Sequence, residues 1–137
     1  MKIIIAGSRS ITDMKEVEAA MKASNADKKA TEIVSGGAKG VDTLAIAWAK
    51  RHRVPCKVMK ADWNNLDVPG AVICVNPNPK IDGYYNAKAG ISRNEDMGRY
   101  ADALVACWDG VSPGTRHMIE FMKKLGKKVY VHRTKHS

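Results

Sequence analysis

Two glycine-containing loops carry the clearest chemical signal in this 137-residue chain. They are Ser35-Gly36-Gly37-Ala38-Lys39-Gly40 and the segment that ends in Gly114-Thr115. Glycine permits positive φ angles and lets backbone N–H groups approach a ligand closely. A helix that starts after such a loop offers free N–H donors and the positive end of its dipole, which favours phosphate. The two loops together indicate a phosphate-bearing ligand.

Each loop taken alone is also typical of a tight turn before a helix. Neither matches Gly-x-Gly-x-x-Gly, and Lys39 is not followed by Ser or Thr, so ATP hydrolysis of the P-loop kind is not predicted. A third polar segment, Gly7-Ser8-Arg9, follows the first apolar run. Arg9 offers a bidentate cation, and polar groups that converge on one edge of a fold favour a pocket.

Carboxylates and aromatic rings also occur directly after apolar runs of the chain. Asp62 and Trp63 follow one apolar run, and Trp108 and Asp109 follow another. A tryptophan there can stack on a nucleobase, and a carboxylate can serve glycosidic cleavage as a base. Asp42 is open to two interpretations, a ligand contact or a local hydrogen bond to the loop.

These residues need a scaffold that brings them together, and the chain predicts one. Short β-branched runs at 2–6, 31–35, 54–60, 103–107 and 128–132 predict strands, and amphipathic segments at 13–29, 39–52, 89–100 and 114–125 predict helices. Thr12 or Asp13 can cap the first helix. This order predicts a Rossmann-like α/β fold: a three-layer sandwich with a parallel sheet of about five strands. Ligands of such sheets bind at the carboxyl ends of the strands.

Residues 64–86 interrupt the alternation with Pro69, Pro77, Pro79 and several Asn and Gly residues. We interpret this segment as an inserted loop that contains a short hairpin around residues 72–75.

Composition limits the remaining classes. Hydrophobic residues make up 45% of the chain, which is sufficient for a core, and residues 1–137 are predicted to form a single domain. No apolar run approaches the length of a membrane span or a signal peptide, so we expect a cytoplasmic protein with no membrane partner. Three cysteines at wide spacing favour neither disulfides nor zinc, and the sequence predicts no metal site and no cofactor.

The formal net charge of +9 makes a polyanionic partner plausible. Much of this charge comes from lysines that fall on solvated helix faces and near the carboxyl terminus. The cations expected at strand ends are fewer: Arg9, Lys39 and Arg93. The charge is therefore weaker support for a nucleic-acid partner than the glycine loops are for a small phosphorylated molecule.

An ordered set of motifs resembles the YspA-like branch of the SLOG superfamily. The motifs are Gly7-Ser8-Arg9, Ser35-Gly36-Gly37-Ala38-Lys39-Gly40-Val41-Asp42, Ala61-Asp62-Trp63, Ala89-Gly90, Arg93-Asn94 with Met97, and Asp109-Gly110 through Gly114-Thr115. That superfamily joins the DNA-processing protein DprA (Smf) with the LOG cytokinin-activating phosphoribohydrolases. The resemblance implies a Rossmann-like fold that binds nucleotides or nucleotide-derived molecules, and it suggests a homo-oligomer.

The chain departs from the LOG pattern at one important position. In LOG enzymes an Arg in an Arg-Lys-x-x-Met stretch and a Glu just after Gly-Thr carry out N-glycosidic cleavage. Arg93 and Met97 match the first stretch, whereas Arg116, and not a glutamate, follows Thr115. Glu120 lies on a different face of the predicted helix. A hydrolase would need a substitute carboxylate.

Three functions stay open on these grounds. The first is binding of a nucleotide or nucleotide-derived small molecule, such as a nucleoside phosphate, an ADP-ribose-like molecule or a cyclic signal, to sense or sequester it. The alternatives are a LOG-like phosphoribohydrolase and a DprA-like nucleic-acid binder. The candidate catalytic residues are Arg93, Asp62 and Asp109. The candidate ligand-binding residues are Gly7, Ser8, Arg9, Ser35, Gly36, Gly37, Ala38, Lys39, Gly40, Asp42, Asp62, Trp63, Arg93, Asn94, Trp108, Gly110, Ser112, Gly114 and Thr115.

Overall fold

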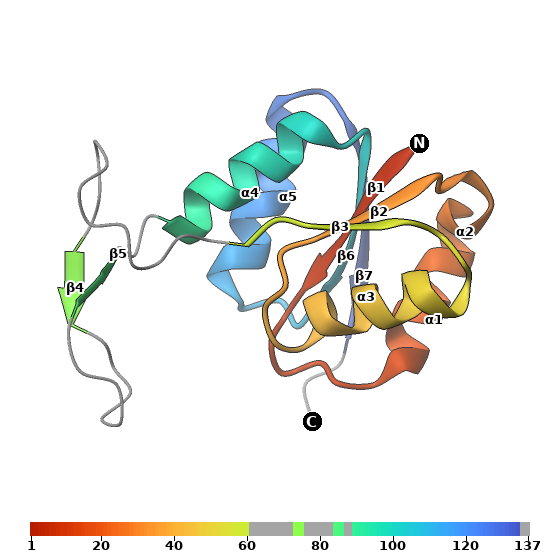
Figure 1. The fold of residues 1–137 in the computed structure, drawn as a ribbon, viewed down its shortest axis with the longest axis horizontal. Coiled ribbons are helices and arrows are strands. Elements are labelled where there is room, and N and C mark those ends of the chain that lie inside the picture. Colours follow the sequence, from red (N-terminus) through yellow and green to blue (C-terminus); the bar gives the residue numbers. More distant parts are fainter. Residues whose placement is uncertain (61–72, 76–83, 87–88, 135–137) are drawn as a thin grey trace.

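The architecture is an open five-stranded parallel sheet with helices on both faces (Figure 1). The computed structural model describes residues 1–60, 73–75, 84–86 and 89–134. The sheet strands are β1 (Lys2–Gly7), β2 (Glu32–Ser35), β3 (Cys56–Val58), β6 (Ala103–Trp108) and β7 (Lys128–Arg133). The helices are α1 (Met14–Ala23), α2 (Ala26–Lys29), α3 (Val41–Arg51), α4 (Ala89–Tyr100) and α5 (Pro113–Lys124).

The sheet has the strand order β3-β2-β1-β6-β7, and every neighbouring pair is parallel. The chain therefore moves outward from β1 to β3 on one side and returns to build β6 and β7 on the other. The carboxyl ends of β1 and β6 flank the point where this direction reverses, and an open α/β sheet binds its ligands there. The predicted Rossmann-like α/β fold is confirmed.

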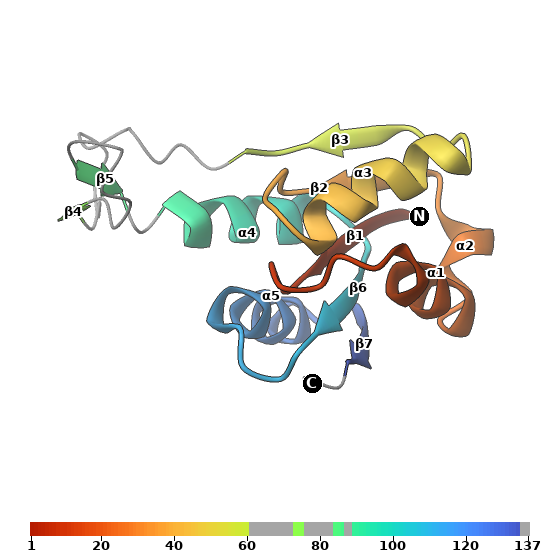
Figure 2. The same cartoon turned by 90° about the horizontal axis from the view of Figure 1, so that it is seen from below.

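Alternation along the central strands divides the core into two layers, one on each face of the sheet. Ile3 and Ile5 of β1 pack under α1, α2 and α3, whereas Ile4 and Ala6 pack under α4 and α5. Figure 2 shows the two sets of helices on opposite sides of the sheet. Trp48 of α3 is 1% exposed and belongs to the first layer.

The helix predicted over residues 13–29 is wrong in one respect, because it is two helices. Ser24 donates its hydroxyl to the carbonyl oxygen of Ala20 at 2.7 Å and accepts the N–H of Ala26 at 3.3 Å. Asn25 adopts the left-handed region at φ 59°. Serine and asparagine offer the backbone local hydrogen bonds that compete with a continuous helix. The predicted cap is confirmed at Asp13, which accepts the N–H of Lys15 at 2.9 Å.

The insertion contains an antiparallel strand pair, of which one strand lies at the residues where a short hairpin was expected (72–75) and the other lies farther along the chain. β4 (Ile73–Val75) pairs antiparallel with β5 (Tyr84–Asn86), and Cys74 stands opposite Tyr85. Among the helices within the described ranges, none combines the length and apolar character that crossing a membrane requires.

Candidate functional site

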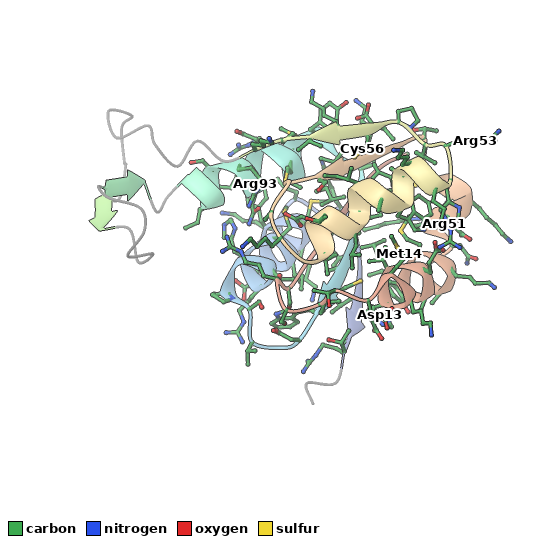
Figure 3. The ribbon with its side chains drawn as sticks, turned by 60° about the horizontal axis from the view of Figure 1, so that its bottom comes forward. Asp13, Met14, Arg51, Arg53, Cys56 and Arg93 are labelled. Atoms are coloured by element: carbon green, nitrogen blue, oxygen red, sulfur yellow. The ribbon has the colours of Figure 1, made fainter. Side chains whose placement is uncertain are left out.

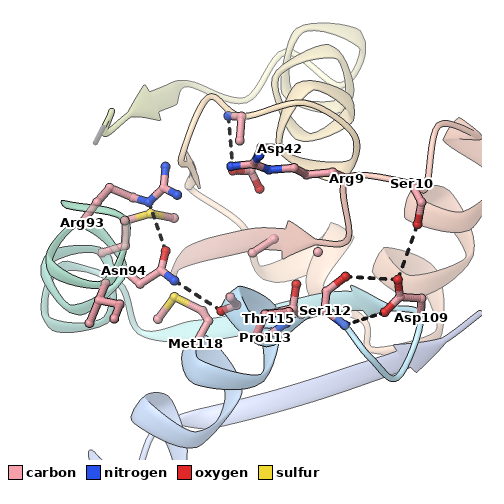
Figure 4. Close-up of a pocket in the computed structure, with 17 residues that line it drawn as sticks. Arg9, Ser10, Asp42, Arg93, Asn94, Asp109, Ser112, Pro113, Thr115 and Met118 are labelled. Atoms are coloured by element: carbon pink, nitrogen blue, oxygen red, sulfur yellow. Dashed lines mark hydrogen bonds between the residues drawn. The ribbon is translucent and has the colours of Figure 1, made fainter. Parts of the chain in front are cut away.

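A cleft of about 600 Å³ opens at the carboxyl ends of β1 and β6, where the direction of the sheet reverses. Its walls come from the loop after β1, the start of α3, the first half of α4, and the loop that leads into α5 (Figure 4). Segments that lie far apart in the sequence thus meet at the position where the topology favours a ligand. Figure 3 shows Arg93 at this side of the molecule, away from Arg51 and Arg53 at the other end of the sheet.

Arg93 lies at the centre of one wall and contacts the first glycine loop. Its Nη1 atom donates to the carbonyl oxygen of Gly36 at 2.7 Å, and its Nε atom donates to Oδ1 of Asn94 at 3.0 Å. Gly36 is buried, and a side chain there would overlap both the Arg93 guanidinium and Oδ2 of Asp42. Glycine is therefore needed at this position for close approach by charged groups, and not for an unusual φ.

Asp42 faces this guanidinium from the first turn of α3 and is only 7% exposed. Its Oδ2 atom accepts the N–H of Ala38 at 3.3 Å. Burial raises the pKa of the Asp42 carboxyl, and the Arg93 charge, the Ala38 N–H and the Arg9 charge all oppose that rise. Burial also lowers the pKa of Arg93, whereas the Asp42 charge opposes this effect. The cleft thus holds a buried carboxyl between two guanidinium groups.

The loops after β1 and β2 interlock. Gly40 has φ 77°, and a side chain there would also overlap the backbone of Ser8 and Arg9. The carbonyl oxygen of Ser8 accepts the N–H of Ile11 at 3.3 Å and that of Val41 at 3.4 Å. The two glycine-bearing segments therefore pack against each other and form one continuous wall, which includes the backbone that carries Arg9.

Asp109 organises the opposite loop. One carboxylate oxygen accepts the N–H groups of Val111 and Ser112, each at 2.9 Å, and the other accepts the hydroxyls of Ser112 at 3.0 Å and Ser10 at 3.5 Å. Hydrogen bonds from these backbone N–H groups, the one from Val111 contributing most, hold the pKa of Asp109 well below its ordinary value. Asp109 lines the cleft, and its carboxylate oxygens accept hydrogen bonds that stabilise the loop that precedes α5.

Asn94 connects α4 to α5 by donating from Nδ2 to the carbonyl oxygen of Gly114 at 3.3 Å. Below it, Met97 and Met118 are each 1% exposed and form an apolar floor in the cleft. Because α5 begins with Pro113, the N–H groups of Gly114 and Thr115 are in its first turn, where backbone donors lack partners within the helix. The cleft thus combines cations and helix donors with an apolar surface.

The structure brings about half of the candidate residues together. Those that line the cleft are Gly7, Arg9, Ala38, Asp42, Arg93, Asn94, Asp109, Ser112, Gly114 and Thr115. Those that lie outside its lining are Ser8, Ser35, Gly36, Gly37, Lys39, Gly40, Trp108 and Gly110. Asp62 and Trp63 fall outside the described residues.

Several residues outside the lining support it instead. The hydroxyl of Ser8 accepts the N–H of Asp109 at 3.0 Å, which ties the end of β1 to the end of β6. The hydroxyl of Ser35 donates to the carbonyl oxygen of Asp42 at 2.7 Å. Trp108 donates to the carbonyl oxygen of Ser112 at 3.1 Å, and its ring lies 5.6 Å from the guanidinium of Arg116. These contacts shape the loops that form the cleft.

The cleft has further lining residues that are not among the candidate site residues, although Gly90 and Met97 belong to the motifs that carry the SLOG resemblance. They are Ala6, Ser10, Gly90, Ile91, Met97, Pro113 and Met118. Helical spacing could have identified some of them, because Gly90, Arg93, Asn94 and Met97 stand at i, i+3, i+4 and i+7 on one helix face. No comparable signal distinguishes Met118 from an ordinary core residue.

The fold and the cleft together define a Rossmann-like α/β protein with a candidate ligand site at its topological switch point. Residues 1–65 match the family model of the YspA, cpYpsA-related SLOG family, which confirms the resemblance drawn from the motifs. No curated protein matches this chain in sequence.

Two DprA structures are among the solved structures that share the fold. One is DNA processing protein A (DprA) from Streptococcus pneumoniae, with 19% identity, a TM-score of 0.65, and coverage of 95% of this chain and 49% of that chain. The other is DprA from Helicobacter pylori, a protein described as binding single-stranded DNA, with 19% identity, a TM-score of 0.63, and coverage of 96% of this chain and 64% of that chain. The present chain thus spans about half the length of the first protein, and the likeness extends to the fold alone.

Proposed function

We propose that this protein binds a nucleotide or a nucleotide-derived small molecule in the cleft at the carboxyl ends of β1 and β6. One observation carries the proposal: Arg9, Arg93 and the amino end of α5 converge on a single cleft at the switch point of the sheet. Guanidinium groups and helix N-termini both favour phosphate. The SLOG match over residues 1–65 supports the same class of ligand.

The remaining lining suits the other parts of a nucleotide. The floor of Met97 and Met118 offers an apolar surface for a base, with which a methionine sulfur makes favourable contacts. Asp42 offers carboxyl oxygens from the wall that α3 contributes to the cleft, and such oxygens accept hydrogen bonds from ribose hydroxyls. The volume of about 600 Å³ lies within the usual range of small-molecule sites.

Isothermal titration with adenosine, AMP, ADP, ADP-ribose and a cyclic dinucleotide tests the proposal. Arg9 and Lys39 provide a matched pair, because both are exposed cations on interlocked loops but only Arg9 lines the cleft. Loss of one charge-assisted hydrogen bond, worth about 1.5–3 kcal/mol, should weaken phosphate binding by roughly 10- to 100-fold in Arg9→Ala.

Lys39→Ala should leave the affinity within about twofold, and neither variant should alter any binding of adenosine, which has no phosphate. If no member of the panel binds, or if both variants weaken AMP binding equally, the proposed site is not where the phosphate is held.

A nucleic-acid ligand is the second candidate. The formal charge of +9 and the fold shared with DprA from Helicobacter pylori favour it. Binding of a thymidine oligonucleotide across a salt series discriminates the two, because direct phosphate contacts give a steep decrease of log affinity with log salt. A steep slope together with no response to the nucleotide panel would favour this candidate over the first.

A phosphoribohydrolase is the third. Asp42 and Asp109 are the carboxylates among the described lining residues, and glycosidic cleavage ordinarily uses carboxylates. Asp109 accepts two backbone N–H groups and two hydroxyls, whereas Asp42 accepts one backbone N–H group, so Asp42 keeps more of its oxygen lone pairs uncommitted. Chromatography after incubation with nucleoside monophosphates detects a released base, and a release that Arg93→Ala abolishes would favour the enzyme.

A further inference from the structure

A second hollow lies at the opposite end of the sheet from the cleft. It is a groove of about 440 Å³ at the amino ends of β1, β6 and β7, on the face of the sheet that α1, α2 and α3 cover. We name it the amino-end groove. Its lining residues are Met1, Ile3, Ser24, Ala26, Lys29, Ala103, Leu104, Val105, Lys128, Val129 and Tyr130.

The groove exists because the helix over this part of the sheet is interrupted. α1 packs on β6 and β7 but ends at Ala23, and the chain turns through Ser24 and Asn25 into the four-residue α2. The broken helix leaves room beside β7, which is an edge strand of the sheet. A continuous helix over residues 13–29 would not turn at this point.

The floor of the groove is apolar and closely packed. Ile3, Ala103 and Val105 are 1%, 8% and 2% exposed and belong to the core layer under α1. The hollow is bounded by two small residues, Ala26 and Ala103. Larger side chains at these positions would leave less room in the hollow.

Among the described residues, the walls of the groove carry positive charge and no negative charge. Lys29 and Lys128 line the groove from α2 and β7, and both are exposed, whereas no Asp or Glu is among its lining residues. Asp102 stands next to the floor in sequence, but its Oδ2 atom accepts the N–H of Lys2 at 2.8 Å.

Polar groups inside the groove differ in their availability. The hydroxyl of Ser24 is already committed, because it donates to Ala20 and accepts from Ala26. The half-buried Tyr130 brings a ring that packs against the core layer, together with a phenol group that can donate to an acceptor. Within the described residues, no hydrogen bond of this hydroxyl to a protein group is present.

We infer that the amino-end groove binds a small amphipathic anion: an apolar chain or ring that carries a single carboxylate. The apolar body lies on Ile3, Ala103 and Val105, and the carboxylate is held by Lys29 and Lys128. An apolar floor flanked by two exposed lysines is complementary to this class of ligand, and it disfavours an amphipathic cation of equal length. The inference is independent of the nucleotide site.

Titration of the ¹⁵N-labelled protein with decanoate, followed by NMR, tests this inference. Decanoate below its micelle concentration should shift the amide signals of residues 103–105 and 128–130. Decanol should bind more weakly, and decyltrimethylammonium more weakly still. Decanoate that fails to bind, or that shifts only residues 7–10 and 109–115 in the nucleotide cleft, would overturn the inference.

Two variants and a control complete the test. Lys128→Glu should lower the affinity for decanoate at least tenfold and relax the preference for an anion, whereas Lys123→Glu, at an exposed position on α5 outside the groove, should leave both unchanged. Ala103→Leu should abolish binding of both decanoate and decanol by filling the floor. Equal effects of the two lysine variants would refute the charge argument, and this comparison does not depend on whether Ala103→Leu folds.

Discussion

The contact between Gly36 and Arg93 gives the sharpest stability prediction. A Cβ atom at position 36 would lie 2.7 Å from Oδ2 of Asp42 and would overlap Nη1 of Arg93. Because both neighbours are ends of flexible side chains, we expect Gly36→Ala to displace them rather than to unfold the protein. The displacement breaks the 2.7 Å hydrogen bond from Arg93 to the Gly36 carbonyl oxygen.

The expected cost follows from that bond. A hydrogen bond that involves a charged group contributes about 1.5–3 kcal/mol, so Gly36→Ala should lower the free energy of unfolding by about 2 kcal/mol. At about 2.1 cal/mol/K of unfolding entropy per residue, a loss of this size corresponds to a decrease of roughly 7 °C in Tm for a chain of this length. Urea titration and thermal melting, both followed by circular dichroism, measure the two quantities.

Gly114 provides the matched control. It lies in the first turn of α5, and a Cβ atom there would have no heavy atom within 4 Å. Gly114→Ala should therefore be neutral or stabilise the protein by up to about 0.5–1 kcal/mol, since alanine costs less backbone entropy in a helix. The same chemical change should thus destabilise the protein at Gly36 but not at Gly114.

A double-mutant cycle isolates the cause. In the Arg93→Ala background the guanidinium is absent, so Gly36→Ala should cost at least about 1 kcal/mol less than it does in the wild-type chain. The remaining cost would come from Asp42. If Gly36→Ala is as stable as the wild type, or if the two substitutions are additive, then Arg93 does not rest against Gly36 and the described wall of the cleft is incorrect.

Three further predictions concern other parts of the structure. The Nζ atom of Lys127 donates to the carbonyl oxygens of Gly98, Arg99 and Ala101 at 2.7, 3.1 and 2.6 Å. Lys127→Met should therefore lower the free energy of unfolding, measured by urea denaturation, by about 2 kcal/mol. A decrease of less than about 0.5 kcal/mol, as is usual for exposed surface positions, would contradict this role. Hydrogen bonds, the one from the Val111 N–H contributing most, lower the pKa of Asp109 in the folded state. The ionised carboxylate should therefore stabilise the protein above about pH 4, and this stabilisation should be lost as the pH falls. The urea midpoint of the wild type should therefore fall more steeply below pH 4 than that of Asp109→Asn, and parallel curves would exclude this linkage. Burial, with a smaller contribution from Glu16, raises the pKa of Cys107 to about 12, so iodoacetamide at pH 8 should alkylate it only after unfolding, as peptide mass spectrometry can determine.

The fold was predictable because each sheet strand and most helices have strong local signals. The alternation of buried strands with amphipathic helices specified a parallel sheet, and α4 matches the expected range of residues 89–100. The break at Ser24 and Asn25 was missed because apolar periodicity alone does not reveal that a side-chain hydroxyl competes with the helix. The strand predicted over residues 54–60 was also too long, since β3 spans only Cys56–Val58.

The candidate site was predictable at its loops but less so in its details. Arg9, Asp42 and Arg93 line the cleft, since residues at strand ends and helix starts converge in this topology. Lys39 belongs to the same motif and lies outside the lining. Which residues of a loop turn inward depends on φ angles and on contacts with distant segments, and neither is encoded in the spacing of the motif.

The position of β1 and β6 has a consequence for the kinetics of amide hydrogen exchange. Both strands are paired on both sides, and Ile4 and Ile5 are fully buried, so their amides should exchange only when the whole domain unfolds. The loops that form the rim of the cleft have few backbone partners and should open locally at a much lower free energy. A ligand in the cleft would thus contact both the most protected and some of the least protected parts of the molecule. Compared with the free protein, its binding should slow amide exchange far more in the rim loops than in the strands beneath them.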